Sequence, residues 1–298
     1  MKQSNSNWRA EVSLALVAFV WGATFVLVKS ALDDVSALLF LALRFTLAGA
    51  ALLIAYHRKL SGAFAPGALV WQGGLLAGVC LFGGYAFQTL GLRFTTPSKS
   101  AFLTGMAIVM VPLLNAVFYR VAPLAAEVAG VAVAAAGMGL MTLESADLRL
   151  APGDALTLVG SVFFGLHIIA IGHYAPRTGF QPLTLIQVGL AAVLGWTTCR
   201  TLETPHIAWS GTVAAALLVT GLFATAAAFT IQAWAQQRTG PTRTALILAL
   251  EPVFAWLTSF LVLREVLSWR SAGGAALILA GILAVELKPL ARRGHPSV

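Results

Sequence analysis

Charged residues are scarce in this sequence. Only 10% of its 298 residues are Asp, Glu, Lys or Arg, whereas soluble domains carry about 25%. Hydrophobic residues make up 59% of the chain, and the mean hydropathy is +0.86. Too few charges are present to cover the surface of a water-soluble protein, which excludes a soluble enzyme and a disordered chain. We therefore expect an integral membrane protein built of helices.

Cysteine and several catalytic motifs are also scarce or missing. The two cysteines, Cys80 and Cys199, each lie within an apolar run, which excludes a disulfide-stapled secreted domain. No Walker A sequence and no HExxH motif occurs, which argues against an ATP-driven pump and a zinc protease. The sequence also lacks a pair of aspartates within the apolar runs. We expect no catalytic residues, no metal and no cofactor.

Long apolar stretches make up most of the chain. A membrane-spanning helix needs about 20 mostly apolar residues, and ten stretches approach or reach this length. They are Val12–Val28, Val35–Tyr56, Leu69–Thr89, Ser100–Tyr119, Val128–Leu143, Ala155–Tyr174, Pro182–Cys199, Gly211–Trp234, Thr244–Leu263 and Ser271–Val285. The first is not expected to be a signal peptide, because no small-residue cleavage site follows it. The connections are too short for a soluble domain.

Basic residues are unevenly divided between the two sides of the predicted membrane domain. Ten spans place both termini on one side, and that side carries Lys2, Arg9, Arg58, Lys59, Arg120, Arg177, Arg238, Arg243, Lys288, Arg292 and Arg293. The other side carries Lys29, Arg93, Lys99, Arg149, Arg200, Arg264 and Arg270. Excess Lys and Arg mark the cytoplasmic side. The bias of Lys and Arg toward the side of the termini therefore predicts that both termini are cytoplasmic. Because the basic residues are scattered between apolar runs, membrane orientation explains the net charge of +8 better than nucleic-acid binding does.

The two halves of the sequence resemble each other. Residues 88–101 read QTLGLRFTTPSKSA, and residues 232–245 read QAWAQQRTGPTRTA. An offset of 144 pairs Gln88 with Gln232, Thr95 with Thr239, Pro97 with Pro241, Lys99 with Arg243, Gly130 with Gly274 and Gly137 with Gly281. In the earlier spans an offset of 143 pairs Glu11 with Asp154, Gly22 with Gly165 and Arg44 with Gln187. Residues paired by these offsets are called repeat equivalents below.

Each repeat holds five spans, and this odd number requires the second copy to enter the membrane upside down. The sequence therefore predicts an all-α integral membrane fold, in which ten transmembrane helices form two inverted five-helix repeats around a central cavity. Residues 1–147 are expected to form the first repeat and residues 148–298 the second. This arrangement is typical of secondary transporters, whose substrate site lies near the middle of the membrane between the repeats.

Several longer segments carry a resemblance to a known family. They are WGATFVLVK (Trp21–Lys29), ALRF (Ala42–Phe45), FQTLGLRFTTPSKSAFLTGM (Phe87–Met106), LEPVFAWLTSFLVLREVLSW (Leu250–Trp269) and GGAALILAGILAV (Gly273–Val285). Together they resemble EamA-type permeases of the drug/metabolite transporter superfamily. The organisation and hydropathy of the chain resemble those of the bacterial amino-acid exporters of this group, including the exporters named for aromatic amino acids. The resemblance implies two inverted repeats with helices 1, 3, 4, 6, 8 and 9 around the cavity. It also implies export of amino acids, other metabolites or drugs.

Two ionisable residues fall inside the predicted spans. Glu251 precedes Pro252 in the ninth span, where proline tends to kink the helix. Its carboxyl group is a candidate site for a proton or for a substrate amine, and the alternative is a structural hydrogen bond. Arg44 lies in the second span, which the resemblance places outside the cavity wall, so we expect a structural role. Whether Arg44 pairs with Glu251 is left open.

Polar and aromatic residues in the other spans are the remaining candidates for the cavity wall. His167 and its repeat equivalent Thr24 occupy two helices that the resemblance places at the cavity. Tyr85 and Gln88 lie one turn apart, and amides such as Gln88 and its repeat equivalent Gln232 can bind both groups of a zwitterion. The alternative for each is a hydrogen bond between helices. The aromatic candidates are Trp21, Phe82, Phe102, Phe164 and Trp234, each of which could instead face lipid.

Small-residue motifs complete the pattern. Gly74-x-x-x-Gly78 and the pair Gly273–Gly274 allow helices to approach closely. We expect this packing within the bundle, with a homodimer face as the alternative.

The sequence thus predicts a protein that is not an enzyme. We expect a multi-pass secondary transporter of the inner membrane that exports small metabolites, above all aromatic or neutral amino acids, by alternating access. Its expected partners are that substrate and the lipid bilayer. Sugars, nucleotide-sugars and drugs are alternative substrates on the same fold. An intramembrane enzyme using Glu251 and His167, and a channel, are alternatives of other classes. The coupling ion, the oligomeric state and the facing state stay open.

Overall fold

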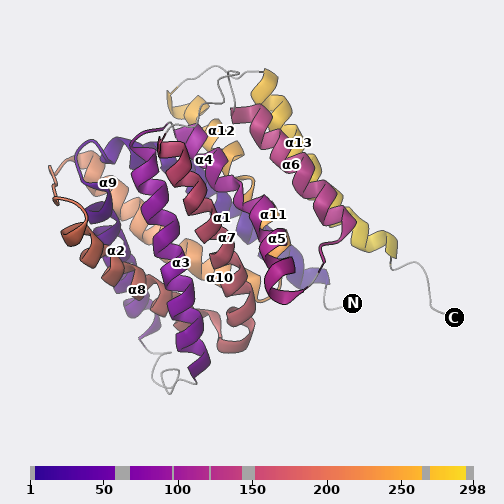
Figure 1. The fold of residues 1–298 in the computed structure, drawn as a ribbon, viewed down its shortest axis with the longest axis horizontal. Coiled ribbons are helices and arrows are strands. Elements are labelled where there is room, and N and C mark those ends of the chain that lie inside the picture. Colours follow the sequence, from indigo (N-terminus) through magenta and orange to yellow (C-terminus); the bar gives the residue numbers. More distant parts are fainter. Residues whose placement is uncertain are drawn as a thin grey trace.

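The computed structural model describes residues 4–57, 68–95, 97–120, 122–142, 152–263 and 269–292. The described chain is almost entirely helical (Figure 1). The elements are α1 (Ser4–Ala31), α2 (Ala37–Tyr56), α3 (Ala68–Leu92), α4 (Pro97–Gly105), α5 (Ala107–Tyr119), α6 (Ala125–Thr142), α7 (Pro152–Thr178), α8 (Phe180–Thr201), α9 (Gly211–Leu218), η1 (Val219–Ala227), α10 (Ala228–Gln236), α11 (Pro241–Leu248), α12 (Glu251–Leu263) and α13 (Trp269–Arg292).

These elements form the ten predicted crossings. Within the described residues, seven crossings are long and apolar enough to span a bilayer: Trp8–Ala31, Ala37–Tyr56, Leu69–Leu92, Lys99–Phe118, Pro152–Thr178, Phe180–Thr201 and Gly211–Gln236. Ala125–Leu140 and Ala272–Ala284 are shorter apolar helices, and α11 with α12 makes the remaining crossing. The all-α membrane fold is therefore confirmed. In Figure 1, α1 begins and α13 ends on the same side of the bundle.

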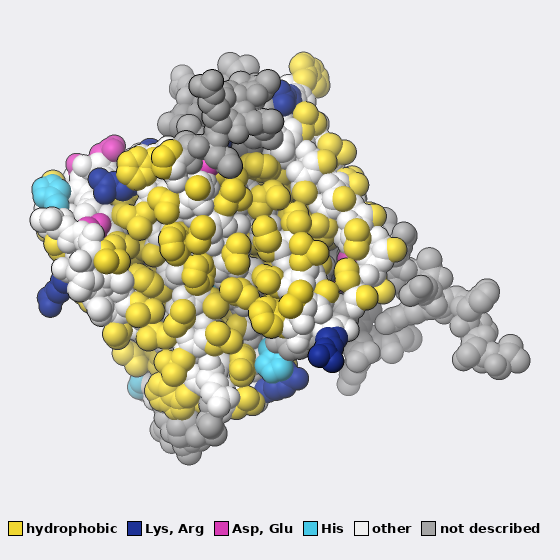
Figure 2. Space-filling view, in the orientation of Figure 1, with side chains coloured by type: hydrophobic (Ala, Val, Ile, Leu, Met, Phe, Trp, Pro, Cys, Tyr) yellow, Lys and Arg dark blue, Asp and Glu magenta, His cyan; other side chains and the backbone are white. Residues whose placement is uncertain are grey.

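The outer surface of the bundle suits a hydrocarbon solvent. Large apolar side chains such as Leu16, Ile54 and Val117 are at least 59% exposed. Figure 2 shows hydrophobic side chains over the middle of the molecule, with the visible charged side chains toward its ends. An apolar belt between two charged rims is the surface that a bilayer requires.

The helix contacts have the symmetry of an inverted repeat. The second crossing of each repeat packs on its own equivalent (α2 on α8), as does the fifth (α6 on α13). Other contacts occur in exchanged pairs: α3 packs on α7 while α10 packs on α1, and α1 packs on α12 while α7 packs on α5. Equivalent helices of the two repeats therefore present equivalent faces to the interior of the bundle. The predicted repeat boundary between Asp147 and Leu148 lies outside the described residues.

The contact between α6 and α13 shows this symmetry at the level of single glycines (Figure 1). A Cβ atom added to Gly137 would lie 2.6 Å from the carbonyl oxygen of Gly274, and one added to Gly281 would lie 2.5 Å from that of Gly130. The two contacts are equivalent to each other, because Gly137 is the repeat equivalent of Gly281 and Gly130 is that of Gly274. Only glycine permits backbones to approach so closely.

The other small-residue motif also packs inside the bundle. A Cβ atom on Gly74 would meet Ile186, and one on Gly78 would meet Leu190, both on α8. The predicted use of these glycines is therefore packing within one chain, and their faces are not available to a second copy.

Two crossings are broken, and the sequence predicts a kink in one of them, at Pro252. α4 ends at Gly105 and α5 begins at Ala107, while α11 ends at Leu248 and α12 begins at Glu251. The breaks lie at repeat-equivalent positions. In the second repeat Pro252 lacks the N–H group that would continue the hydrogen-bond ladder, which accounts for a helix that restarts there. Broken helices near the middle of a membrane are typical of transporter binding sites.

Candidate functional site

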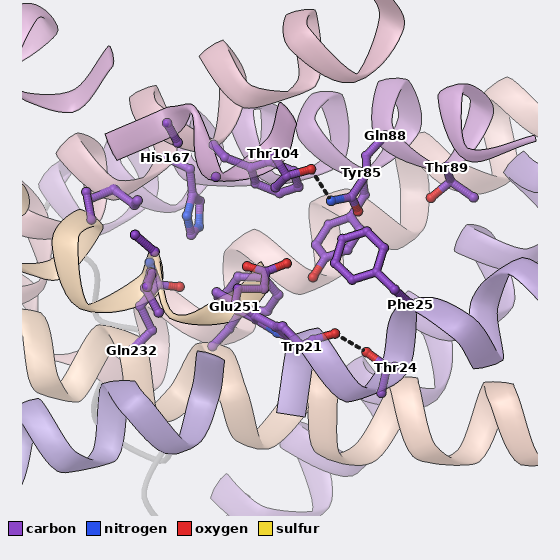
Figure 3. Close-up of a pocket in the computed structure, with 18 of the residues that line it drawn as sticks. Trp21, Thr24, Phe25, Tyr85, Gln88, Thr89, Thr104, His167, Gln232 and Glu251 are labelled. Atoms are coloured by element: carbon purple, nitrogen blue, oxygen red, sulfur yellow. Dashed lines mark hydrogen bonds between the residues drawn. The ribbon is translucent and has the colours of Figure 1, made fainter. Parts of the chain in front are cut away.

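A cavity lies between the two repeats, beside the two helix breaks (Figure 3). Its volume is about 70 Å³, enough for several water molecules. The residues that line it are Trp21, Thr24, Phe25, Val28, Arg44, Tyr85, Gln88, Thr89, Leu92, Thr104, Gly105, Ala107, Ile108, Phe164, His167, Ile168, Phe229, Gln232, Ala245, Leu248, Ala249 and Glu251.

Most of the lining consists of repeat equivalents. The pairs are Trp21 with Phe164, Thr24 with His167, Phe25 with Ile168, Tyr85 with Phe229, Gln88 with Gln232, Thr104 with Leu248, Gly105 with Ala249 and Ala107 with Glu251. The positions are symmetric, but the chemistry is not, because the equivalent of Glu251 is an alanine. The cavity therefore lies on the pseudo-two-fold axis and has chemically distinct ends.

The lining extends farther toward one side of the bundle. Val28, Thr89 and Leu92, near the ends of α1 and α3, belong to it. Their repeat equivalents are Ile171, Ala233 and Gln236, which are buried and absent from the lining. The cavity thus reaches toward the side opposite the chain termini, and packed side chains close the side of the termini.

The structure brings most of the sequence-predicted candidates together. Eight of the nine line the cavity: Trp21, Thr24, Tyr85, Gln88, Phe164, His167, Gln232 and Glu251. They come from α1, α3, α7, α10 and α12, as the family resemblance implies. No group of three His, Cys, Asp or Glu side chains that could hold a metal ion occurs in the described part of the chain.

Phe102 is the exception and needs a correction. It is absent from the lining and packs against the apolar cluster that contains Ile108 and Val131. The reason is helical periodicity: Thr104, two residues later, faces the cavity, so Phe102 points to the far side of α4. The aromatic candidates Phe82 and Trp234 also lie outside the lining.

The expected position of Arg44 also needs a correction. Its helix, the second crossing, was expected outside the cavity wall, but the Arg44 side chain lines the cavity. Its side chain is 3% exposed. Its Nε donates a hydrogen bond to Thr225 Oγ1 at 2.7 Å, and one Nη donates to the hydroxyl of Tyr85 at 3.1 Å. The guanidinium also lies 4.3 Å from the centre of the Tyr85 ring, within cation–π range. The long arginine side chain extends inward past its own helix, which the span assignment alone did not reveal.

Arg44 forms no ion pair with Glu251 in the structure. The described ion pairs involve neither residue. Instead, the partners of Arg44 include η1, a π-helical segment of the eighth crossing. The backbone oxygen of Ala224 accepts hydrogen bonds from Trp21 Nε1 at 2.8 Å and from Arg44 at 3.4 Å. Short π-helical segments are frequent at functional sites. Sequence reasoning missed η1, because its short sequence carries no distinguishing pattern.

Glu251 is the first residue of α12, where the helix dipole favours a negative charge. It is 7% exposed. Within the described residues its carboxyl group makes no hydrogen bond. In Figure 3 it lies between Gln232 and Tyr85. A carboxyl group in this setting can receive a proton or a cationic ligand.

The two cavity glutamines differ in their partners. Gln88 Nε2 donates a hydrogen bond to Thr104 Oγ1 at 2.8 Å. Gln232 Nε2 donates to Gln236 Oε1 at 3.0 Å, and the buried Gln232 Oε1 has no hydrogen-bond partner. Thr104 was not among the sequence candidates. Its signal would have been a hydroxyl group within the fourth span, which the family resemblance places at the cavity.

His167 is held from the neighbouring helix. Its Nε2 lies 2.7 Å from Gln187 Oε1, and its ring makes an edge contact with Phe229. Gln187 is the repeat equivalent of Arg44. The structure thus combines both sequence interpretations of His167, because the residue lines the cavity and also joins two helices.

Comparison with known proteins agrees with this organisation. The sequence profile of the EamA-like transporter family matches residues 8–143 and again residues 151–287. The two matches correspond to the two repeats. Together they cover most of the chain.

Individual relatives extend over nearly the whole chain. An uncharacterized transporter of Archaeoglobus fulgidus is 34% identical over 281 residues, covering 94% of this chain and 86% of the relative. A probable terminal-alkyne amino-acid exporter of Streptantibioticus cattleyicolor is 26% identical, covering 100% of this chain and 98% of the relative. A protein of known crystal structure has a similar fold, with a TM-score of 0.79, 20% identity and coverage of 99% and 100% of the two chains.

Proposed function

This chain belongs to the EamA-like transporter family, and we propose that it is a carrier that exports small zwitterionic amino acids, with a preference for aromatic or neutral side chains. The proposal places the protein in the inner membrane with both termini in the cytoplasm. The substrate would bind in the cavity between the repeats, and the repeats would expose it to each side in turn.

One observation carries the proposal. The cavity presents both a guanidinium, from Arg44, and a carboxyl group, from Glu251, and these two groups do not pair with each other. Opposite charges at separate points of a buried cavity match a molecule that itself carries both charges. The aromatic walls supplied by Trp21, Phe164 and Phe229 suit an apolar or aromatic substrate side chain.

The same observation weighs against strongly anionic substrates. A nucleotide-sugar carries phosphate charges that need several cationic or N–H donors. Within the described lining, Arg44 is the sole Lys or Arg side chain. The relative named as a probable amino-acid exporter gives independent, though distant, support for an amino-acid substrate.

The test is transport by purified protein in liposomes. Uptake of labelled phenylalanine would be measured with unlabelled amino acids, sugars, nucleotide-sugars and cationic drugs as competitors. We expect saturable uptake that aromatic and neutral amino acids inhibit, and counterflow when the liposomes are preloaded with unlabelled substrate. Flux that does not saturate and shows no counterflow would indicate a channel. Competition by sugars alone would refute the proposed substrate, and product formation without transport would indicate an enzyme.

Coupling would be tested in the same liposomes. Imposing a pH gradient distinguishes a proton-coupled carrier, whose flux follows the gradient, from a facilitator, whose flux ignores it. Glu251 and His167 are the lining residues whose substitution would remove proton dependence.

A further inference from the structure

The hydrogen bonds around Gln232 fix the direction of its amide. Gln236 Nε2 donates to the backbone oxygen of Ile168 at 2.8 Å, which turns Gln236 Oε1 toward Gln232. Only an N–H group can donate to that oxygen, so Gln232 must direct its Nε2 there. The remaining atom, Gln232 Oε1, is therefore an acceptor at the cavity. It is buried and has no partner, which is a costly state for a polar atom.

A second acceptor faces the same space. In Figure 3 the side chains of Gln232 and Glu251 converge from α10 and from the start of α12. Neither the carboxyl group of Glu251 nor Gln232 Oε1 receives a hydrogen bond within the described residues. Two buried acceptors that line one cavity are satisfied by a group with several N–H donors and a positive charge. Arg44 does not fill this role, because its guanidinium is bonded to Thr225 and Tyr85.

Tyr85 provides a donor on the side of Glu251 that faces away from Gln232 (Figure 3). Its hydroxyl oxygen accepts the hydrogen bond from Arg44, which leaves its own hydrogen available to donate. The guanidinium that makes this hydrogen bond lies over the Tyr85 ring, 4.3 Å from its centre, so its positive charge is close to the hydroxyl. An anionic group of a ligand would therefore bind at Tyr85.

We propose that Glu251 and Gln232 form an ammonium-binding subsite, and that Tyr85, backed by Arg44, forms the carboxylate subsite of the same ligand. This inference rests on the proposed function, which it deepens by fixing the orientation of the amino acid. The orientation of the bound amino acid follows from chemical differences between the two repeats. The equivalent of Glu251 is Ala107, and the equivalent of Gln232 is Gln88, whose Nε2 donates to Thr104. The ammonium group can therefore occupy one end of the cavity and not its symmetric counterpart.

The experiment uses three probes that differ only in their charged groups: phenylalanine, phenethylamine, which lacks the carboxylate, and 3-phenylpropionate, which lacks the ammonium. Equilibrium binding of each labelled probe to purified protein would be measured for the wild type and for Glu251→Gln, Gln232→Met and Tyr85→Phe. Thermal unfolding would confirm that each variant is folded. Gln232→Met remains informative if Glu251→Gln does not fold.

We expect Glu251→Gln and Gln232→Met to weaken binding of phenylalanine and phenethylamine about tenfold or more, since both variants remove an acceptor for a charged donor. Binding of 3-phenylpropionate should change less than threefold. Tyr85→Phe should do the reverse, weakening 3-phenylpropionate and sparing phenethylamine. The variants would thus affect opposite sets of probes. A purely structural role of these residues would not produce such opposite effects.

Equal losses for all three probes in folded variants would overturn the subsite assignment, and so would a wild-type protein that binds neither amine-bearing probe. If phenethylamine binds and depends on Glu251 while no amino acid is transported, the ammonium subsite stands and the proposed amino-acid function fails. Transport of phenylalanine with unchanged probe selectivity in the variants would leave the function standing and refute the subsite.

Discussion

Lys99 and Asp154 join the two repeats at one end of the bundle, with 2.5 Å between Nζ and the carboxylate. Their repeat equivalents are Arg243 and Glu11, which form the same ion pair at the opposite end, at 3.1 Å. Each pair links the start of the fourth crossing of one repeat to the start of the first crossing of the other. The inverted symmetry therefore extends from helix packing to individual charges.

The two ion pairs differ in burial, and this difference predicts unequal effects on stability. The Asp154 side chain is fully buried and also accepts a hydrogen bond from Thr95, whereas Glu11 is 23% exposed. We expect Asp154→Asn to lower the free energy of unfolding by about 1–3 kcal/mol, because it leaves a partly buried lysine without its counter-charge. Glu11→Gln should cost less than about 1 kcal/mol. Thermal unfolding of the purified variants would check the order, and equal shifts would contradict it.

Glycines at repeat-equivalent positions give a second matched comparison. A Cβ atom on Gly22 would lie 2.8 Å from the backbone nitrogen of Ala255 and also against the carbonyl of Glu251, and backbone atoms of α12 cannot easily move aside. A Cβ atom on Gly165 would meet side-chain atoms of Leu114 and Met110 at 3.3 and 3.4 Å, and side chains can adjust.

We therefore expect Gly22→Ala to destabilise the protein by about 1–3 kcal/mol through overpacking, and Gly165→Ala to be close to neutral. Gly22→Ala should also reduce transport, because it displaces the segment that positions Glu251. Thermal unfolding and liposome uptake of both variants would measure this. A well-folded, fully active Gly22→Ala protein would show that α1 and α12 have more freedom than the contact indicates.

Much of the fold could be predicted from the sequence, because hydropathy and repeat offsets depend only on residue type and spacing. The membrane class, the ten crossings and the inverted repeat all follow from such patterns. The break between α4 and α5 was missed. In the second repeat Pro252 marks the break. Its repeat equivalent in the first repeat is Ile108, and the nearest proline, Pro112, lies one turn farther along α5.

The candidate site was harder to predict, because membership in a cavity depends on side-chain direction. Polar residues inside spans were reliable indicators, since a buried polar group needs a partner or a cavity. Aromatic residues were less reliable indicators of the cavity wall, since Phe102 lies on the face of α4 that packs against an apolar cluster instead of lining the cavity. Arg44 lines the cavity although the resemblance places its helix outside the cavity wall, because the position of a helix does not show how far a long side chain reaches. Its structural role stays a prediction.

The orientation of the protein in the membrane can be tested with two exposed positions at opposite ends of the bundle. Trp209 precedes α9 and is 69% exposed, and His57 follows α2 and is also exposed. If the termini are cytoplasmic, a membrane-impermeant thiol reagent added to intact cells should label Trp209→Cys and not His57→Cys. Permeabilised cells should show labelling of both. The native Cys80 and Cys199 are buried, so the wild type serves as the unlabelled control, and the reverse pattern would refute the orientation.

The hydrogen bond between Arg44 and Thr225 predicts that η1 contributes to substrate binding without lining the cavity. Thr225→Val removes the acceptor of Arg44 Nε, which frees the guanidinium to turn away from Tyr85. Loss of a hydrogen bond to a charged group is worth about 1.5–3 kcal/mol, so we expect the KM for phenylalanine uptake to rise about tenfold or more. Thr220→Val is the matched control, because Thr220 is equally buried in η1 but donates to the backbone oxygen of Ala216 in α9, within the same crossing. If both variants raise KM equally, η1 acts through general packing rather than through Arg44.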